Sequence, residues 1–146
     1  MDSIQISGSE FDSLDAMMGA VADEAVRIAA DDHGMTLDYS PESIARLETV
    51  LAARTPVPEA DLENATRMWG AYFGEVFRRR YPAEWIMAVY PGREVAMPAL
   101  DIGGSQIYPL LKVYRRLTMG PGEDLAGFYT KVTTALEAAK GRGSGR

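Results

Sequence analysis

The residues with the clearest potential for chemistry are basic. Arginines occupy positions 78–80, another follows the Pro-Gly pair at 91–92, and a later basic group repeats at i, i+3 and i+4, as on one helix face. Arginine makes forked contacts to carboxylates and phosphates, so convergence of these groups would bind an anion or an acidic protein face. A helix dipole also favours cations at its C-terminal end without a ligand, and both interpretations stay open. The candidate binding residues are Arg79, Arg93, Lys112, Arg115 and Arg116.

A pair of carboxylates is a second candidate for chemistry. Glu75 falls on a predicted helix and Glu84 begins the strand that follows, and two carboxylates can share acid and base roles. However, Arg78 and Arg79 lie three and four residues after Glu75, where they can form ion pairs on the same helix. We therefore interpret Glu75 as a structural residue.

Other catalytic and metal-binding patterns are weak. Asp31, Asp32 and His33 form the only metal-like grouping, but EF-hand spacing is missing, and the chain has one histidine and no cysteine. No serine stands in a strand-turn-helix elbow. The glycine-rich segment 103–105 lacks the lysine of a phosphate-binding loop. We predict no catalytic residue, no metal site and no cofactor.

Composition describes an ordinary globular chain with an uneven charge distribution. Of 146 residues, 47% are hydrophobic and 25% charged, and the net charge is −6. Residues 1–74 carry 14 acidic and 4 basic side chains, whereas residues 75–146 carry 7 and 11. The two halves either compensate each other internally or each present one sign of charge to a partner. Overall acidity argues against nucleic-acid binding.

No secretory signal and no membrane span are predicted, so we expect a cytoplasmic protein. No linker divides the chain, and we expect one domain over residues 1–140 with a flexible basic tail at 141–146. Residues 1–8 read as a short strand or a loose arm.

Apolar side chains at helical spacing predict the elements that carry these residues. Ser9 is expected to cap the first helix and Ser40 the second. Strands follow at 84–90, 94–102 and 106–108, separated by glycine turns. Both faces of the first strand are apolar, which predicts that it is covered on both sides, and Pro98 directs the second toward an edge or a bulge. The expected helices span about 10–33, 41–54, 59–80, 110–118 and 123–139.

The predicted fold class is therefore α+β, with about five helices packed on a small two- to three-stranded antiparallel meander. Within the helix at 59–80, Gly70 and Gly74 each cost about 1 kcal/mol relative to alanine. Two such glycines indicate close approach of another helix or strand.

The run from Trp69 to Arg80, with Trp85 after it, resembles a pattern of small bacterial domains of uncharacterised function. In these, a G-x-Y-x-G-E helix precedes a tryptophan-bearing strand, a glycine hairpin and a proline-led basic helix, here matched by residues 109–116. The resemblance covers about residues 60–130 and implies a fold unit of immunity or accessory type, without catalytic residues. Its signature positions are Gly70, Gly74, Glu75 and Trp85.

Two functions follow as hypotheses. The first is a non-enzymatic bacterial domain that binds another protein through complementary acidic and basic faces. The second is a small-molecule domain or degenerate enzyme that holds an anion near Arg79, Arg93 and Lys112, with an aromatic wall from Trp85 and Tyr108. Assembly into a homodimer is compatible with either hypothesis.

Overall fold

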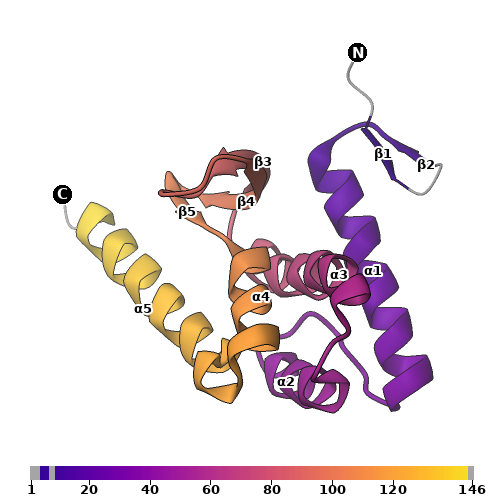
Figure 1. Cartoon of the computed structure of the whole chain (residues 1–146). Helices are drawn as coiled ribbons and strands as arrows, with labels where there is room; N and C mark the ends of the chain where they lie inside the picture. The colour runs from indigo at the N-terminus through magenta and orange to yellow at the C-terminus, as the bar shows by residue number, and fades with distance from the viewer. Residues whose placement is uncertain (1–3, 7–8, 145–146) are drawn as a thin grey trace.

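The computed structural model describes the backbone of residues 4–6 and 9–144 and the side chains of residues 12–140. It confirms the predicted α+β class, with five helices and a three-stranded antiparallel sheet in the described part of the chain (Figure 1). The helices are α1 (Leu14–His33), α2 (Ser43–Arg54), α3 (Glu59–Arg78), α4 (Pro109–Met119) and α5 (Leu125–Ser144). The sheet contains β3 (Glu84–Val89), β4 (Ala96–Ile102) and β5 (Ser105–Ile107). A separate hairpin pairs β1 (Ile4–Ile6) with β2 (Ser9–Phe11), and a 3-10 turn, η1 (Pro121–Glu123), precedes α5.

Helix α3 is the centre of the fold and packs most extensively against α1 and α4. Its second half is buried continuously from Met68 to Phe77. Large aromatic side chains supply most of this buried volume, and Phe73 and Phe77 contact Phe128 of α5. Because burial of such side chains dominates core energetics, α3 holds the surrounding elements in place.

The sheet is a meander with strand order β3-β4-β5. Pro98 was predicted to mark an edge or a bulge, but it lies in the central strand and pairs with Met87 of β3. The proline is tolerated because β5 pairs only with Leu100–Ile102, so the part of β4 that contains Pro98 has a single neighbour.

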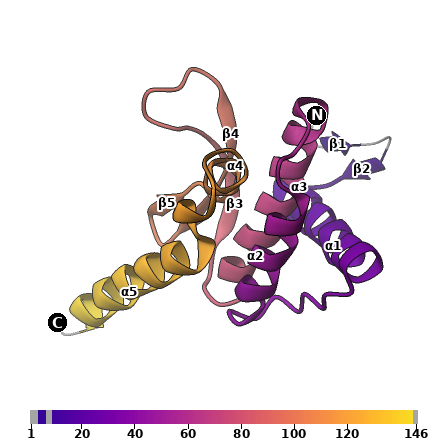
Figure 2. The same cartoon turned by 60° about the horizontal axis from the view of Figure 1, so that its bottom comes forward.

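The prediction that β3 is covered on both faces is wrong. Trp85 is buried, but Met87 is 55% exposed and Val89 is 52% exposed. Trp85 packs on α3 at Gly74, whereas Met87 and Val89 lie further along the strand, toward the exposed β3–β4 connection. Figure 2 shows the connection between β3 and β4 extending beyond the helices.

Two helix boundaries differ from the predictions. Ser13, not Ser9, caps α1 by accepting a hydrogen bond from the Ala16 amide at 3.0 Å, because Ser9 belongs to β2. The backbone of α5 remains helical to Ser144, beyond the predicted end at residue 139, so residues 141–144 of the predicted tail are helical and residues 145–146 lie outside the described part.

Ser40, the predicted cap of α2, makes a hydrogen bond just before this helix, although it is not the N-cap residue itself. The Ser40 hydroxyl accepts a hydrogen bond from the Ser43 amide at 3.2 Å, one turn ahead of the regular part of α2.

Across the described residues, none of the helices has the length and apolar character needed to cross a membrane.

Candidate functional site

The buried carboxylate of Glu75 lies where α3 meets β3. It is 1% exposed and accepts hydrogen bonds from Trp85 Nε1 at 2.8 Å and from Arg78 Nε at 2.6 Å. The hydrogen bond to Glu75 raises the pKa of the Arg78 guanidinium. Glu84, the other carboxylate of the sequence-based pair, is exposed at the start of β3. Glu75 therefore joins α3 to the sheet, and Arg79 does not take part in this ion pair.

The glycines of α3 explain how β3 and α4 approach so closely. A β-carbon at Gly70 would lie 2.8 Å from the backbone of Leu110, and one at Gly74 would lie 3.2 Å from Pro109 and overlap the Trp85 indole. The absence of side chains at these two positions lets α4 and the Trp85 ring contact the helix backbone. These contacts place the start of β3 and of α4 against α3.

A polar network also joins α1, α2 and α3. The Tyr72 hydroxyl lies 2.6 Å from the Ser43 hydroxyl and accepts from the Tyr39 amide at 2.8 Å. The Tyr39 hydroxyl donates to Asp23 at 2.6 Å. Burial is the main reason that the pKa values of both tyrosines are raised, so they are weaker acids than usual. This network stabilises helix packing and offers no activated base.

The five basic candidates do not converge. Arg79 lies 3.6 Å over the Tyr39 ring, near α1 and α2, whereas Arg93 is exposed in the β3–β4 connection. Arg116 is 5% exposed and binds Glu48 of α2 at 2.9 Å. Only Lys112 and Arg115 line one hollow together, on the side of α4 that faces α5.

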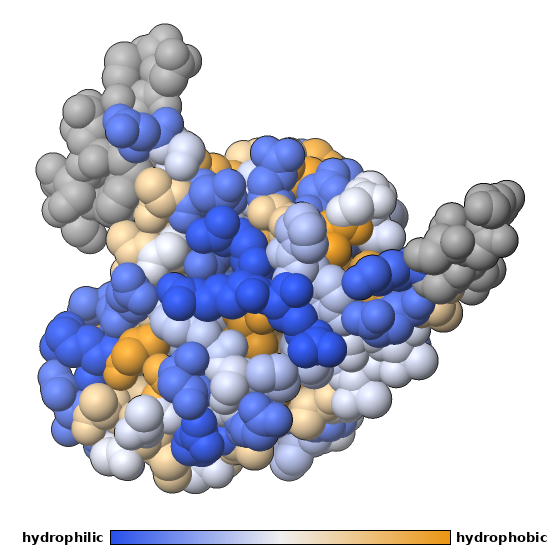
Figure 3. Space-filling view, turned by 180° about the vertical axis from the view of Figure 1, so that it is seen from behind, coloured by the Kyte–Doolittle hydropathy of each residue, from blue (hydrophilic) through white to orange (hydrophobic). Residues whose placement is uncertain are grey.

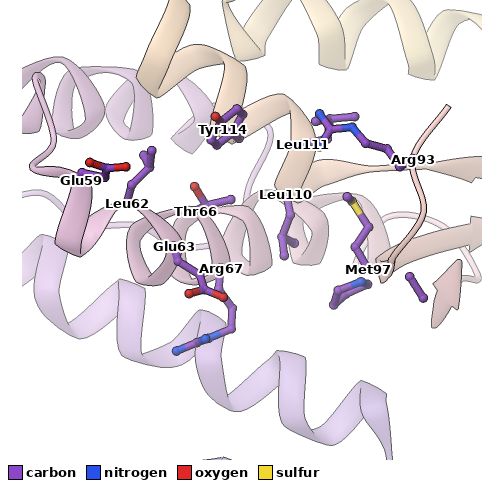
Figure 4. Close-up of a pocket in the computed structure, with 12 residues that line it drawn as sticks. Glu59, Leu62, Glu63, Thr66, Arg67, Arg93, Met97, Leu110, Leu111 and Tyr114 are labelled. Atoms are coloured by element: carbon purple, nitrogen blue, oxygen red, sulfur yellow. The ribbon is translucent and has the colours of Figure 1, made fainter. Parts of the chain in front are cut away.

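An apolar groove runs between the first half of α3, α4 and the start of β4 (Figure 4). Its volume is about 570 Å³. The buried hydroxyl of Thr66 lies in its wall and has no hydrogen-bond partner among the described residues. The apolar lining comes mainly from Leu62, Met97, Pro98, Leu110 and Tyr114, with charged side chains of α3 at its margin.

The outer edge of β3 is free beyond its first residues. The Trp85 amide points away from β4, because it donates to Asp15 of α1 at 2.7 Å. Since amides alternate along a strand, the amides of Met87 and Val89 point away from β4 as well. No described side chain or backbone group binds them, and the Val89 carbonyl has only a long contact of 3.5 Å from the Tyr108 hydroxyl.

The same alternation explains why β4 contains a proline. Trp85 pairs with Leu100 and Met87 with Pro98, and both pairs are of the non-hydrogen-bonded kind because their amides point outward. Pro98 therefore loses no bond to β3. Asp15 protects the first part of the β3 edge, whereas the second part presents two free amides beside two exposed apolar side chains.

The surface seen from behind the view of Figure 1 is mostly hydrophilic. Figure 3 shows that hydrophilic side chains form a band across the back, with small separate apolar areas between them. Isolated apolar residues of this kind are normal on a protein surface. A free strand edge, exposed apolar side chains and an apolar groove occur together on the β3–β4 side.

Sequence reasoning missed this surface, although one signal was available. In a meander of three strands the first strand always lies at an edge, and Met87 and Val89 fall on that strand.

No grouping of three or more histidine, cysteine, aspartate or glutamate side chains that could hold a metal ion occurs in the part of the chain that the structure describes. No protein-family model, curated protein or solved structure matches the chain.

Proposed function

We propose that the chain is a non-enzymatic protein-binding domain of the immunity or accessory type, acting in the bacterial cytoplasm. A partner segment in extended conformation adds to β3 as a further antiparallel or parallel strand. The observation that carries this proposal is the free edge at Met87 and Val89, whose outward amides and exposed side chains have no partner among the described residues. Strand addition is a recurring mode of protein recognition.

The apolar surroundings support a protein partner over a polar ligand. Natural sheet edges are normally protected by charge, proline or a covering segment, and among the described side chains only Asp15, which binds Trp85, protects β3 in this way. On the same face as Met87 and Val89, their paired residues Pro98 and Ala96 line the apolar groove. A partner strand with apolar side chains at alternate positions would cover both features together.

The buried titratable groups support binding over catalysis. Glu75 holds Trp85 and Arg78, and Arg116 holds Glu48, so each of these charges connects two parts of the fold. Such contacts account for their burial without a reaction.

We infer that the split charge contributes to association with this partner only through the charges that are not paired within the fold. Part of the split charge is compensated internally, since Arg116 of the second half binds Glu48 of the first. Asp32 on α1 and Lys131 on α5 are exposed and remain available to steer a partner. Charges of this kind mainly change the association rate and its salt dependence.

The proposal is tested in two stages. Native mass spectrometry of the chain recovered gently from host lysate identifies a stoichiometric polypeptide, whose affinity is then measured with purified proteins. Met87→Lys places a charge in the proposed interface and is expected to weaken binding by about a hundredfold or more, whereas the matched change Met119→Lys, at a residue 69% exposed on α4, leaves it within about twofold.

A proline substitution tests the contribution of the β3 backbone to partner binding separately from that of the side chains. Met87→Pro removes an amide that is not used within the sheet, so the fold is expected to persist while strand addition is lost. Equal affinity of the wild type and Met87→Pro would refute strand addition. A homodimer without any second polypeptide would instead identify another copy of the chain as the occupant and refute the accessory assignment.

A further inference from the structure

A second hollow lies on the other side of α4 from the groove, between α4, α5 and the end of the sheet. Its volume is about 360 Å³, within the range of small-molecule sites. The described residues of the lining combine basic and aromatic side chains and include no carboxylate. The hollow adjoins the β3 edge at Tyr90 and Tyr108, whose hydroxyl contacts the Val89 carbonyl at 3.5 Å, but its cations come from α4 and α5.

The basic side chains of the hollow come from two helices. Arg115 of α4 and Lys131 of α5 both line it, and neither forms an ion pair with a carboxylate of the described residues. Lys112 also lines it, but its ammonium is held by Glu123 at 2.9 Å. Two uncompensated cations on facing helices match the two charges of a phosphate monoester better than the single charge of a carboxylate.

The aromatic side chains provide a wall for a flat ring. Tyr90 and Tyr108 meet edge to face with their ring centres 5.0 Å apart, and Phe128 of α5 is a third aromatic residue of the lining. The Arg115 guanidinium lies 5.9 Å from the centre of the Tyr90 ring, so charge and aromatic surface are adjacent. Rings bind such walls through offset or edge contacts.

We propose that this hollow binds a small organic phosphate that carries an aromatic ring, of the size of a nucleoside monophosphate. The phosphate lies between Arg115 and Lys131, and the ring packs against Tyr90 and Tyr108. Gln106, at the rim, supplies an amide that can bind polar groups on the ring.

Titration calorimetry with adenosine monophosphate and phenyl phosphate tests the proposal. At near-physiological salt we expect saturable one-to-one binding of both compounds, with amide NMR shifts localised to Tyr108 and Lys131. Adenosine and inorganic phosphate are expected to bind at least about tenfold more weakly, because each provides only one of the two interactions. Absence of saturable binding by either aromatic phosphate would overturn the proposal.

Substitutions that remove one positive charge at a time test which residues bind the phosphate. Arg115→Gln and Lys131→Gln are each expected to weaken binding of adenosine monophosphate by about tenfold or more. Arg93→Gln removes the same charge from the exposed β3–β4 connection and is expected to leave the affinity within about twofold. Unfolding curves of the three variants verify that each is folded.

The remaining outcomes are also decisive. Equal affinity for inorganic phosphate and adenosine monophosphate would refute the aromatic part of the site, and equal affinity for adenosine would refute the anion part. An unchanged affinity in both Arg115→Gln and Lys131→Gln would place the binding elsewhere on the molecule and overturn the assignment.

Discussion

Replacement of Gly74 by alanine tests how the fold positions the free strand. The added methyl group would overlap the Trp85 indole and lie 3.2 Å from Pro109. The indole cannot move away without losing its hydrogen bond to Glu75, which is 2.8 Å long and buried. Gly74→Ala is therefore expected to disturb β3, although alanine is the better helix former.

The expected magnitude follows from three contributions. Overpacking costs about 1–3 kcal/mol, and a lost hydrogen bond to a buried charged group costs about 1.5–3 kcal/mol. Alanine offsets about 1 kcal/mol of this through its helix propensity. The free energy of unfolding should fall by about 1.5–5 kcal/mol.

Chemical denaturation followed by tryptophan fluorescence measures this change. Gly19→Ala is a matched control in α1, because the nearest atom to its β-carbon is Glu75 Oε1 at 3.9 Å, an ordinary contact. That control should gain about 0.5–1 kcal/mol of stability. If Gly74→Ala were as stable as Gly19→Ala, the close contact between α3 and Trp85 would be refuted.

Two further predictions concern buried polar groups. Arg116→Ala removes the ion-pair partner of Glu48, which keeps its hydrogen bonds from the Leu125 and Ala126 amides, and should lower the free energy of unfolding in urea by about 1.5–3 kcal/mol; a loss no larger than that of Arg115→Ala would contradict a structural role for this ion pair. In alkali, burial raises the pKa values of three tyrosines in the folded state, so their contribution to stability is present below about pH 10 and is lost as the pH rises further. Their ionisation, followed by absorbance at 295 nm, should coincide with unfolding rather than precede it, and earlier ionisation without unfolding would contradict this. These tyrosines are Tyr39, Tyr72 and Tyr129.

Local patterns predicted the elements well where a single helix or turn determines them. The apolar spacing of α3, its end before Tyr81-Pro82 and the glycine turns between strands all follow from short-range rules, and the structure has these elements close to the predicted residues. The cap of α1 was misplaced because Ser9 and Ser13 are both followed by acidic residues that suit a helix start, and only pairing of β2 with β1 distinguishes them.

Long-range contacts explain what the sequence could not predict about the candidate sites. Arg116 belongs by spacing to the same helix face as Lys112, but it binds Glu48, which is 68 positions earlier in the chain. The exposed state of Met87 depends on which elements pack against β3, and the apolar alternation of β3 does not contain that information. The hollow at Arg115 and Lys131 similarly depends on the angle between α4 and α5.

Amide hydrogen exchange of the complex with its copurified partner tests strand addition most directly. In the free chain the amides of Met87 and Val89 should exchange rapidly, whereas those of Ile86 and Ala88, which point toward β4, should already be protected. The partner is expected to slow exchange at Met87 and Val89 by about a hundredfold or more. Unchanged exchange at both amides in a saturated complex would contradict the proposal that β3 receives the partner.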